Sequence, residues 1–342
     1  MNRTLNRIVT TTIAAALLIV LIVCCTKKEE DAGAVMGIFP SEVINLADIN
    51  SPYDDYNSAL GVADGSRELL FSTKRNTPGN GSFSYISASL EFVYNKCNKS
   101  FDISARVPGN SFLAELASDI STAGNDLGPF RIVCRVDGRE YTVTTTEMED
   151  GTLSLIYYRY MPWFGTAIPD IGEGSPVTRL NSVHNDGYFS IDHTQTKVFF
   201  SSDRDGSYDI YYAEKPRDVS LADWFSMSGG DITKVDSINS SSNDMAPLVF
   251  HDLILFASDR PGGLGGYDIY YSVFEDGKWG APVNFGPPVN SPSNEFRPVI
   301  GSQTGFKDHF LIFSSDREGG KGGYDLYFTG IKIPDPPATF EK

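Results

Sequence analysis

The chain has 342 residues, of which 12% are aromatic and 41% hydrophobic, so it can form a packed core and is not a disordered protein. Its formal net charge of −16 argues against nucleic acid as a partner, because an acidic surface repels phosphate backbones. The 32 glycines, 19 prolines and 17 tyrosines favour short strands and tight turns over long helices.

The N-terminal segment reads as a secretory signal. Arg3 and Arg7 precede an uncharged, apolar stretch over 8–23, and a basic start followed by an apolar stretch is typical of exported proteins. A transmembrane anchor is the alternative, since the stretch is nearly long enough to span a bilayer. The stretch ends abruptly at Cys24 and Cys25, before a polar run, so we predict a signal peptide over 1–24.

These cysteines resemble the lipobox of bacterial lipoproteins, in which the cleaved chain begins with a lipidated cysteine. The family pattern has a small residue before that cysteine, which favours Cys25 over Cys24, because Cys24 follows the β-branched Val23. The resemblance implies a tether over 25–37 and attachment to outer-membrane lipid, facing the periplasm or the cell surface. Lysines and acids over 27–31 are similar to the surface-export signal of Bacteroidetes lipoproteins, or form a solvated tether.

A hairpin pattern recurs along the rest of the chain. Each copy reads as an apolar strand, a Gly-rich turn that allows a tight reversal, and an aromatic strand. Three clear copies span 198–212, 254–271 and 311–328, and two weaker copies begin at Leu69 and Val143. The sequence therefore predicts five related β-hairpins.

A second motif precedes each hairpin and ends in an acid. The five acids lie 51 to 71 residues apart and are Asp55, Asp126, Asp186, Asp244 and Glu295. Two motifs that repeat in step indicate one structural unit of about four strands, which is a propeller blade.

We therefore predict an all-β, five-bladed propeller over 38–330, followed by a Pro-rich tail over 331–342. The segment before Asp55 is similar to the one before Glu295, so we expect the N-terminal segment to supply the missing outer strand of the last blade. A six-bladed ring, with an unrecognised blade within 95–125, is the alternative.

The repeated pattern SDRxGGxGGYDIYY resembles the TolB-type, WD-like propeller repeat of Bacteroidetes envelope proteins. The resemblance implies contacts between proteins in the cell envelope and no shared chemistry. We expect an interaction or scaffolding module rather than an enzyme, without a cofactor, that binds an envelope protein or a glycan at the propeller rim. The alternatives are a glycan-binding surface lipoprotein and a propeller-fold polysaccharide lyase or glycosidase.

Acid–arginine pairs recur once per clear repeat. A structural role at the hairpin base is expected, because an active site needs different groups that converge rather than one group repeated. The pairs are Asp203–Arg204, Asp259–Arg260 and Asp316–Arg317. Asp203, Asp205 and Asp209 have part of the spacing of a calcium loop, but the closing glutamate is missing, which favours a simple turn.

Three histidines, His193, His251 and His309, are spaced 58 residues apart and fall between the first and second strands of three blades. Propeller-fold sugar lyases hold a metal with histidines, so these three are weak metal candidates. Turns of neighbouring blades are expected to lie too far apart to share one ion, so we predict no metal site.

Two further sets of residues leave alternatives open. Cys97 and Cys134 could form a disulfide in an exported protein or remain as two buried thiols. Trp163, Trp224 and Trp279 lie near predicted outer strands, where core packing and glycan stacking are both possible uses.

Overall fold

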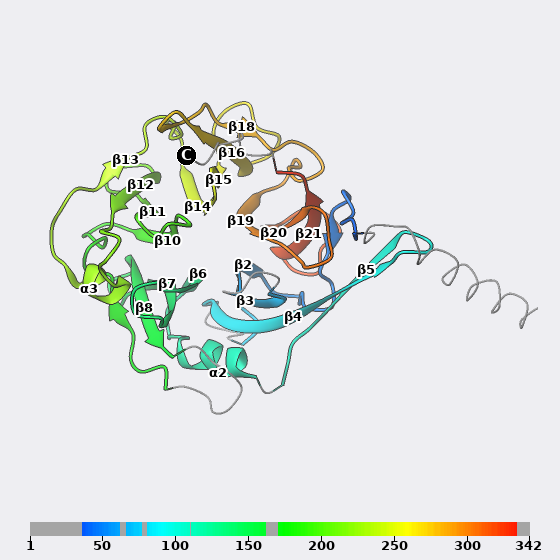
Figure 1. Ribbon diagram of the computed structural model, residues 1–342, viewed down its shortest axis with the longest axis horizontal. Helices are drawn as coiled ribbons and strands as arrows, with labels where there is room; N and C mark the ends of the chain where they lie inside the picture. Colours follow the sequence, from blue (N-terminus) through cyan, green and yellow to red (C-terminus); the bar gives the residue numbers. More distant parts are fainter. Residues whose placement is uncertain (1–35, 62–65, 77–80, 110, 162–169, 334–342) are drawn as a thin grey trace, which may run out of the picture.

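The computed structural model describes residues 36–61, 66–76, 81–109, 111–161 and 170–333. Five antiparallel sheets stand around a central axis and form a five-bladed propeller, as predicted (Figure 1). The predicted signal peptide with Cys24 and Cys25, nearly all of the tether, and most of the C-terminal tail lie outside the described residues.

Blades 1 to 3 each have four strands, which follow one another in chain order from the axis outward. Blade 1 contains β2 (Asp55–Leu60), β3 (Glu68–Thr73), β4 (Ser84–Asn95) and β5 (Ser100–Arg106). Blade 2 contains β6 (Asp126–Val133), β7 (Glu140–Glu147), β8 (Leu153–Tyr160) and β9 (Ser175–Pro176). Blade 3 contains β10 (Asp186–Ile191), β11 (Lys197–Ser202), β12 (Asp209–Glu214) and β13 (Thr233–Lys234).

Blades 4 and 5 differ at their outer edges. Blade 4 contains β14 (Asp244–Phe250), β15 (Leu253–Ser258) and β16 (Asp268–Glu275), and β16 pairs with both β17 (Lys278–Trp279) and β18 (Val283–Asn284). Blade 5 contains β19 (Glu295–Gly301), β20 (His309–Ser315), β21 (Asp325–Ile331) and, as its outer strand, β1 (Ile44–Asn45).

The ring closes through β1, as predicted. Ile44 pairs with Phe328 and Asn45 with Tyr327, so the N-terminal strand completes the last blade (Figure 1). Phe39 strengthens this closure by packing against rings from blades 1 and 5, among them Phe92, Phe310 and Phe328. Closure removes a sheet edge that would otherwise pair with other chains.

The alternative of a sixth blade within 95–125 is wrong. That segment contains all of β5 and the helix α2 (Phe112–Asp119), which begins at an N-cap where the Ser111 hydroxyl accepts the N–H of Ala114. The apolar face of α2 packs on residues of blades 1 and 2. A second helix, α3 (Leu221–Ser226), joins β12 to β13. Neither helix of the described residues is long and apolar enough to cross a bilayer.

Every innermost strand has a bulge at its third residue. The pairing with the second strand shifts there in all five blades, and the third residue has a φ between 48° and 57°. These bulge residues are Asn57, Gly128, Tyr188, Ala246 and Arg297. A bulge bends the strand and redirects side chains, which here brings the bulge residues of different blades together near the axis.

No disulfide joins Cys97 and Cys134. Cys97 is exposed in the turn between β4 and β5, whereas Cys134 is buried in a core cluster that extends from blade 2 into blade 3.

Candidate functional site

The five repeat acids begin the five innermost strands and are fully buried. In four blades an arginine two residues after the second strand binds this carboxylate at 2.5 to 3.0 Å. The pairs are Asp55–Arg75, Asp186–Arg204, Asp244–Arg260 and Glu295–Arg317.

Arg204 illustrates the contacts of this repeated arginine. Its Nε donates to the Ser202 hydroxyl at 2.9 Å and its Nη2 donates to the Leu180 carbonyl at 2.9 Å. The guanidinium also lies over the rings of Phe200 and Tyr211, 5.1 Å from each centroid. Arg260 and Arg317 repeat this set, so each arginine ties a hairpin to the loop that precedes its blade.

The acids that precede these arginines join the blades. Asp203, Asp259 and Asp316 each accept the backbone N–H and the side-chain amide of an asparagine at 2.7 to 2.9 Å. These asparagines, Asn185, Asn243 and Asn294, in turn accept a backbone N–H from the preceding blade.

The three acids with calcium-loop spacing do not converge. Asp203 binds Asn185, Asp205 accepts the Tyr211 hydroxyl at 2.7 Å, and Asp209 pairs with Lys234 at 2.6 Å. Their carboxylates are therefore committed to three separate contacts.

Side chains fill the middle of the propeller. Arg297 of blade 5 is buried and donates to the Pro129 carbonyl of blade 2 at 2.9 Å, which requires it to cross the axis. It lies over the ring of Tyr188 in blade 3, at 5.8 Å, and burial lowers the pKa of its guanidinium to about 10. A side chain at Gly128 would clash with Tyr188, since an added Cβ would lie 2.6 Å from the ring.

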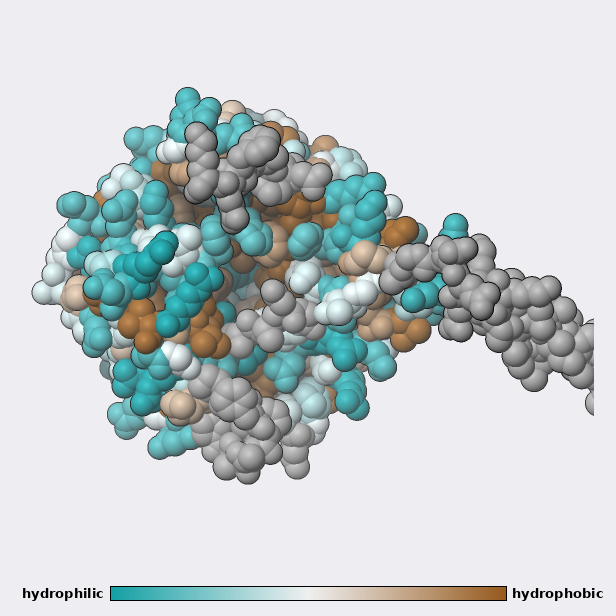
Figure 2. Space-filling view, in the orientation of Figure 1, coloured by the Kyte–Doolittle hydropathy of each residue, from teal (hydrophilic) through white to brown (hydrophobic). Residues whose placement is uncertain are grey.

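None of the five bulge residues is an acid, and the five buried repeat acids lie two residues earlier, at the start of the same strands. Figure 2 shows one face of the ring, where brown, hydrophobic residues lie toward the middle and teal, hydrophilic residues dominate the rim.

The structure brings two of the three candidate histidines together. The rings of His193 and His251 lie 5.5 Å apart, closer than the sequence led us to expect for turns of neighbouring blades. His309 is the first residue of β20, and its ring packs against Phe250 instead, at 5.2 Å. In the part of the chain that the structure describes, no group of three or more His, Cys, Asp or Glu side chains could hold a metal ion.

His193 and His251 lie at the edge of a pocket of about 190 Å³ between blades 3 and 4, which we call the blade 3–4 pocket. Its apolar lining is Phe199, Val249, Phe274 and Trp279. The Trp279 ring packs edge-on against Phe274 and Phe199, at 5.0 and 6.0 Å. The ammonium of Lys197 lies 5.6 Å from the Phe274 ring. The pocket thus combines an aromatic wall with a few polar groups, as small-molecule sites do.

Asp192 and Asp252 supply two carboxylates to the same pocket. Burial would raise the pKa of Asp192, but hydrogen bonds outweigh it and lower the pKa below its ordinary value. These bonds come from the Thr194 hydroxyl and from the backbone N–H groups of Thr196 and Lys197. Asp192 is therefore held as a carboxylate near neutral pH.

The tryptophans have different surroundings. Trp224 is 1% exposed and belongs to the core, and its indole N–H donates to the Glu214 carbonyl at 3.1 Å. Trp279 is partly exposed and lines the blade 3–4 pocket. Trp163 lies outside the described residues.

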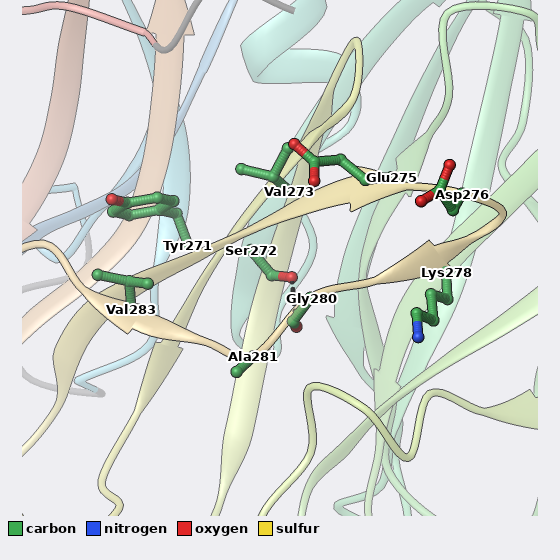
Figure 3. Close-up of a pocket in the computed structure, with 9 residues that line it drawn as sticks. All are labelled: Tyr271, Ser272, Val273, Glu275, Asp276, Lys278, Gly280, Ala281 and Val283. Carbon is green, nitrogen blue, oxygen red and sulfur yellow. Dashed lines mark hydrogen bonds between the residues drawn. The ribbon is translucent and has the colours of Figure 1, made fainter. Parts of the chain in front are cut away.

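A second hollow, of about 360 Å³, lies at the outer edge of blade 4 (Figure 3). Tyr271 and Val283 stand at one end of it, and the Ser272 hydroxyl is bonded to the Gly280 carbonyl at 2.7 Å. The acids of the β16–β17 hairpin and Lys278 lie on opposite sides of that hairpin (Figure 3). This hollow therefore lacks a set of polar groups that converge.

No sequence motif singles out Asp192, Lys197 or Phe274, and all three were missed. They come from two blades, and nothing in the repeat marks them as a group. The available signal was local: Asp192 directly precedes one of the three periodic histidines.

Comparison with models of known protein families finds no match, and comparison with characterised protein sequences finds none either. Solved structures do match. A thermostable family-43 glycoside hydrolase aligns with a TM-score of 0.53 and 12% identity, over 84% of this chain and 93% of the hydrolase. An endo-arabinase from Bacteroides thetaiotaomicron aligns with a TM-score of 0.51 and 13% identity, over 88% of this chain and 98% of the arabinase.

A protein assigned as TolB from Agrobacterium tumefaciens also matches, with a TM-score of 0.41 and 13% identity, over 87% of this chain and 100% of that protein. At this TM-score we draw no conclusion from the match beyond its presence among the propellers.

The expectation that this chain is not an enzyme is contradicted by these matches. Two of the matching structures, each with a TM-score above 0.5, are a glycoside hydrolase and an endo-arabinase. The repetition of one acid–arginine pair led us to expect a structural role, yet repeated blades also form the fold of those enzymes. At 12 to 13% identity, these matches show that the chain has a similar fold.

Proposed function

We propose that this protein acts on carbohydrate as a propeller glycoside hydrolase, and that its saccharide site is the blade 3–4 pocket. The observation that carries the proposal is the meeting of Trp279 with Asp192 and Asp252 around one cavity. Aromatic rings offer a flat apolar surface to the C–H face of a sugar, while carboxylates and imidazoles bind its hydroxyl groups.

The size of the pocket suits one sugar residue of a longer glycan. Its volume of about 190 Å³ is below the ~300–1,000 Å³ of sites that enclose drug-sized ligands. His193 and His251, which line the pocket, are exposed, so the rest of a polysaccharide has room to continue along the surface beside them.

Hydrolysis of a glycosidic bond breaks the bond between the anomeric carbon and the bridging oxygen. Water supplies hydroxide to the carbon and a proton to the oxygen, and most glycosidases use two carboxyl groups for these steps. We assign the ionised role to Asp192, because its hydrogen bonds hold it as a carboxylate. Asp252 is the second carboxyl group of this assignment, and His193 and His251 bind hydroxyl groups of the sugar.

We further propose that an acyl chain on Cys25, or on Cys24, anchors the propeller at the outer membrane, facing the periplasm or the cell surface. This proposal rests on the N-terminal sequence alone. The interaction with an envelope protein at the rim, which the sequence favoured, stays a prediction.

The test uses the full chain and a panel of polysaccharides that includes arabinan, with binding and release of reducing sugar both measured. Trp279→Ala is expected to weaken binding about tenfold, since stacking on an aromatic ring contributes about 1 kcal/mol or more. Asp192→Asn and Asp252→Asn are expected to abolish hydrolysis while binding persists.

Tyr53→Ala removes another exposed aromatic side chain, far from the pocket in sequence, and serves as the control. Binding without any hydrolysis by the unmodified protein would refute the hydrolase and leave a glycan-binding protein. Equal loss in the Tyr53 and Trp279 variants would refute the site.

A further inference from the structure

Blade 2 lacks the arginine that the other four blades share. Strand pairing places Thr146 opposite Asp126, as Ser202 lies opposite Asp186 in blade 3. The residue two positions later is Arg204 in blade 3 and Met148 in blade 2. The cation of the repeat is therefore absent from this blade.

Asp126, the repeat acid of blade 2, nevertheless has hydrogen-bond partners like those of the other repeat acids. Asp126 accepts the backbone N–H and hydroxyl of Thr122, at 2.6 and 3.1 Å, and the hydroxyl of Thr146 at 3.2 Å. Asp186 keeps the same kind of contacts with Ser182, and the arginine is added to them. Among the described residues Asp126 forms no ion pair, although its side chain is fully buried.

The side chains that enclose the guanidinium elsewhere are also smaller in blade 2. The positions of Phe200 and Tyr211 are taken by Thr144 and Ile156, as the strand pairing shows. A surface pocket of about 630 Å³ lies at this position, which we call the blade 2 pocket. Its lining includes Met148, Ile156 and Tyr158, and Glu147 and Glu149 also line it. Thr122 and Thr146, the two hydrogen-bond partners of Asp126, line it as well, so the buried carboxylate lies directly behind the pocket wall.

One carbonyl of the arginine site is only weakly engaged in blade 2. The Tyr158 hydroxyl donates to the Ile120 carbonyl at 3.4 Å, which is long for a hydrogen bond. The equivalent carbonyls accept from arginine at 2.5 to 2.9 Å in the other blades. A stronger donor could therefore replace the phenol at little cost.

We propose that the blade 2 pocket binds the side chain of an arginine presented by a partner protein, at the position that the chain's own arginine fills in the other four blades. The four internal copies define the chemistry: a planar guanidinium that donates to a buried carboxylate, to a hydroxyl and to a carbonyl. Glu147, Glu149 and the net charge of −16 favour a basic partner. This inference stands apart from the proposed hydrolase, whose pocket lies between blades 3 and 4.

Guanidinium selectivity follows from geometry. In the four internal copies Nη2 donates to both the carboxylate and the carbonyl, while Nε donates to the hydroxyl at the end of the second strand. Arginine can therefore donate to Asp126 and the Ile120 carbonyl with one nitrogen and to the Thr146 hydroxyl with another, because its donors form a rigid fork. A lysine ammonium has one nitrogen and cannot reach all three acceptors in this arrangement. We therefore expect an arginine side chain to bind about tenfold more tightly than a lysine side chain.

The experiment measures binding of N-acetyl-arginine methylamide and of its lysine counterpart to the full chain by titration calorimetry. The arginine probe is expected to bind, and the lysine probe about tenfold more weakly. Met148→Arg restores the repeat residue, so it should raise the melting temperature and weaken binding of the arginine probe about tenfold or more. Leu264→Arg adds the same charge at an exposed hairpin position of blade 4 and should leave binding unchanged.

Four results would overturn the proposal. Three are failure of the unmodified protein to bind the arginine probe, equal affinity for the lysine probe, and undiminished binding by a folded Met148→Arg variant. Equal weakening by Met148→Arg and Leu264→Arg would also overturn it, since charge repulsion would then explain the loss.

Discussion

Asp126 is the one repeat acid that has no arginine partner among the described residues. Burial raises its pKa to about 6, against the bonds from Thr122 and Thr146 that lower it. Burial, and then the charge of Asp126, raise the pKa values of Tyr85 and Tyr158, so these two phenols stay neutral over this range. Without an arginine, ionisation of this carboxylate opposes folding.

The pH dependence of stability tests this. The folded pKa lies above the unfolded one, so the folded state holds more protons between these values and the free energy of unfolding rises as the pH falls through about 6. The gain between pH 7 and pH 5 is about 1 kcal/mol. The Asp126→Asn variant should lack this gain in the free energy of unfolding. Urea unfolding of the unmodified protein and of the variant, at pH 7 and at pH 5, measures it. If the free energies of unfolding of the two proteins differ by the same amount at pH 7 and at pH 5, then Asp126 is not the group that causes the pH dependence.

At the scale of the element, the strand β1 closes the ring with only two paired residues. Asn50 adds to this junction, because its side chain both accepts the N–H and donates to the carbonyl of Leu326, each at 2.9 Å. Asn290 makes the same pair of bonds with Ile269 between blades 4 and 5, at 2.8 Å. The two asparagines thus make equivalent contacts, one at the closure and one within the ring.

This equivalence makes a matched pair of variants. Asn50→Ala and Asn290→Ala should each cost about 1–3 kcal/mol in the free energy of unfolding, since each leaves a buried backbone N–H unpaired. The two carbonyls each keep a backbone partner, the N–H of Leu46 at Leu326 and the N–H of Phe285 at Ile269. Only Asn50→Ala should speed amide hydrogen exchange in β21, because the short β1 cannot hold the closure alone. Equal exchange rates in β21 for both variants would show that β1 does not depend on Asn50.

On the scale of the whole molecule, an acidic propeller is joined to a predicted lipid anchor. Two or more acyl chains hold a protein stably on a membrane. Charged residues make up 21% of the chain, so we expect the attachment to come from the anchor and not from the propeller surface. The location of the protein then depends on one cysteine.

Detergent phase partitioning checks this prediction. The protein made in a bacterial host should enter the detergent phase, Cys25→Ser should move to the aqueous phase, and Cys24→Ser should stay with the detergent. The reverse pattern would make Cys24 the lipidated residue. Retention of both variants in the detergent phase would favour a transmembrane anchor instead.

Much of the fold could be predicted because each blade repeats a short local pattern. The hairpins, the acid that begins each inner strand and the similarity of the two outer-strand segments are all local signals. The alternation of apolar and polar residues did not predict which side chains are buried. Both faces of strands such as β10 and β15 are buried between neighbouring blades.

The candidate sites could be predicted only in part. The periodicity of His193 and His251 was visible, but their 5.5 Å approach depends on how two blades pack. Met148 was visible as a departure from the repeated arginine, yet only the neighbouring strands reveal that a pocket and a buried carboxylate remain there.

The amino-acid sequence by itself therefore determined the blade, because its hairpins follow from hydrogen bonds and turns between residues close in the chain. It also predicted five blades and the closing strand, because the pattern repeats and the two outer-strand segments are similar, although a sixth blade stayed open until the structure excluded it. Tertiary structure alone decided that the axis is filled by Tyr188 and Arg297, and that cavities lie between blades 3 and 4 and in blade 2. The size of a cavity depends on the combined volume of the side chains that pack around it, and a local sequence pattern does not show which side chains will pack together.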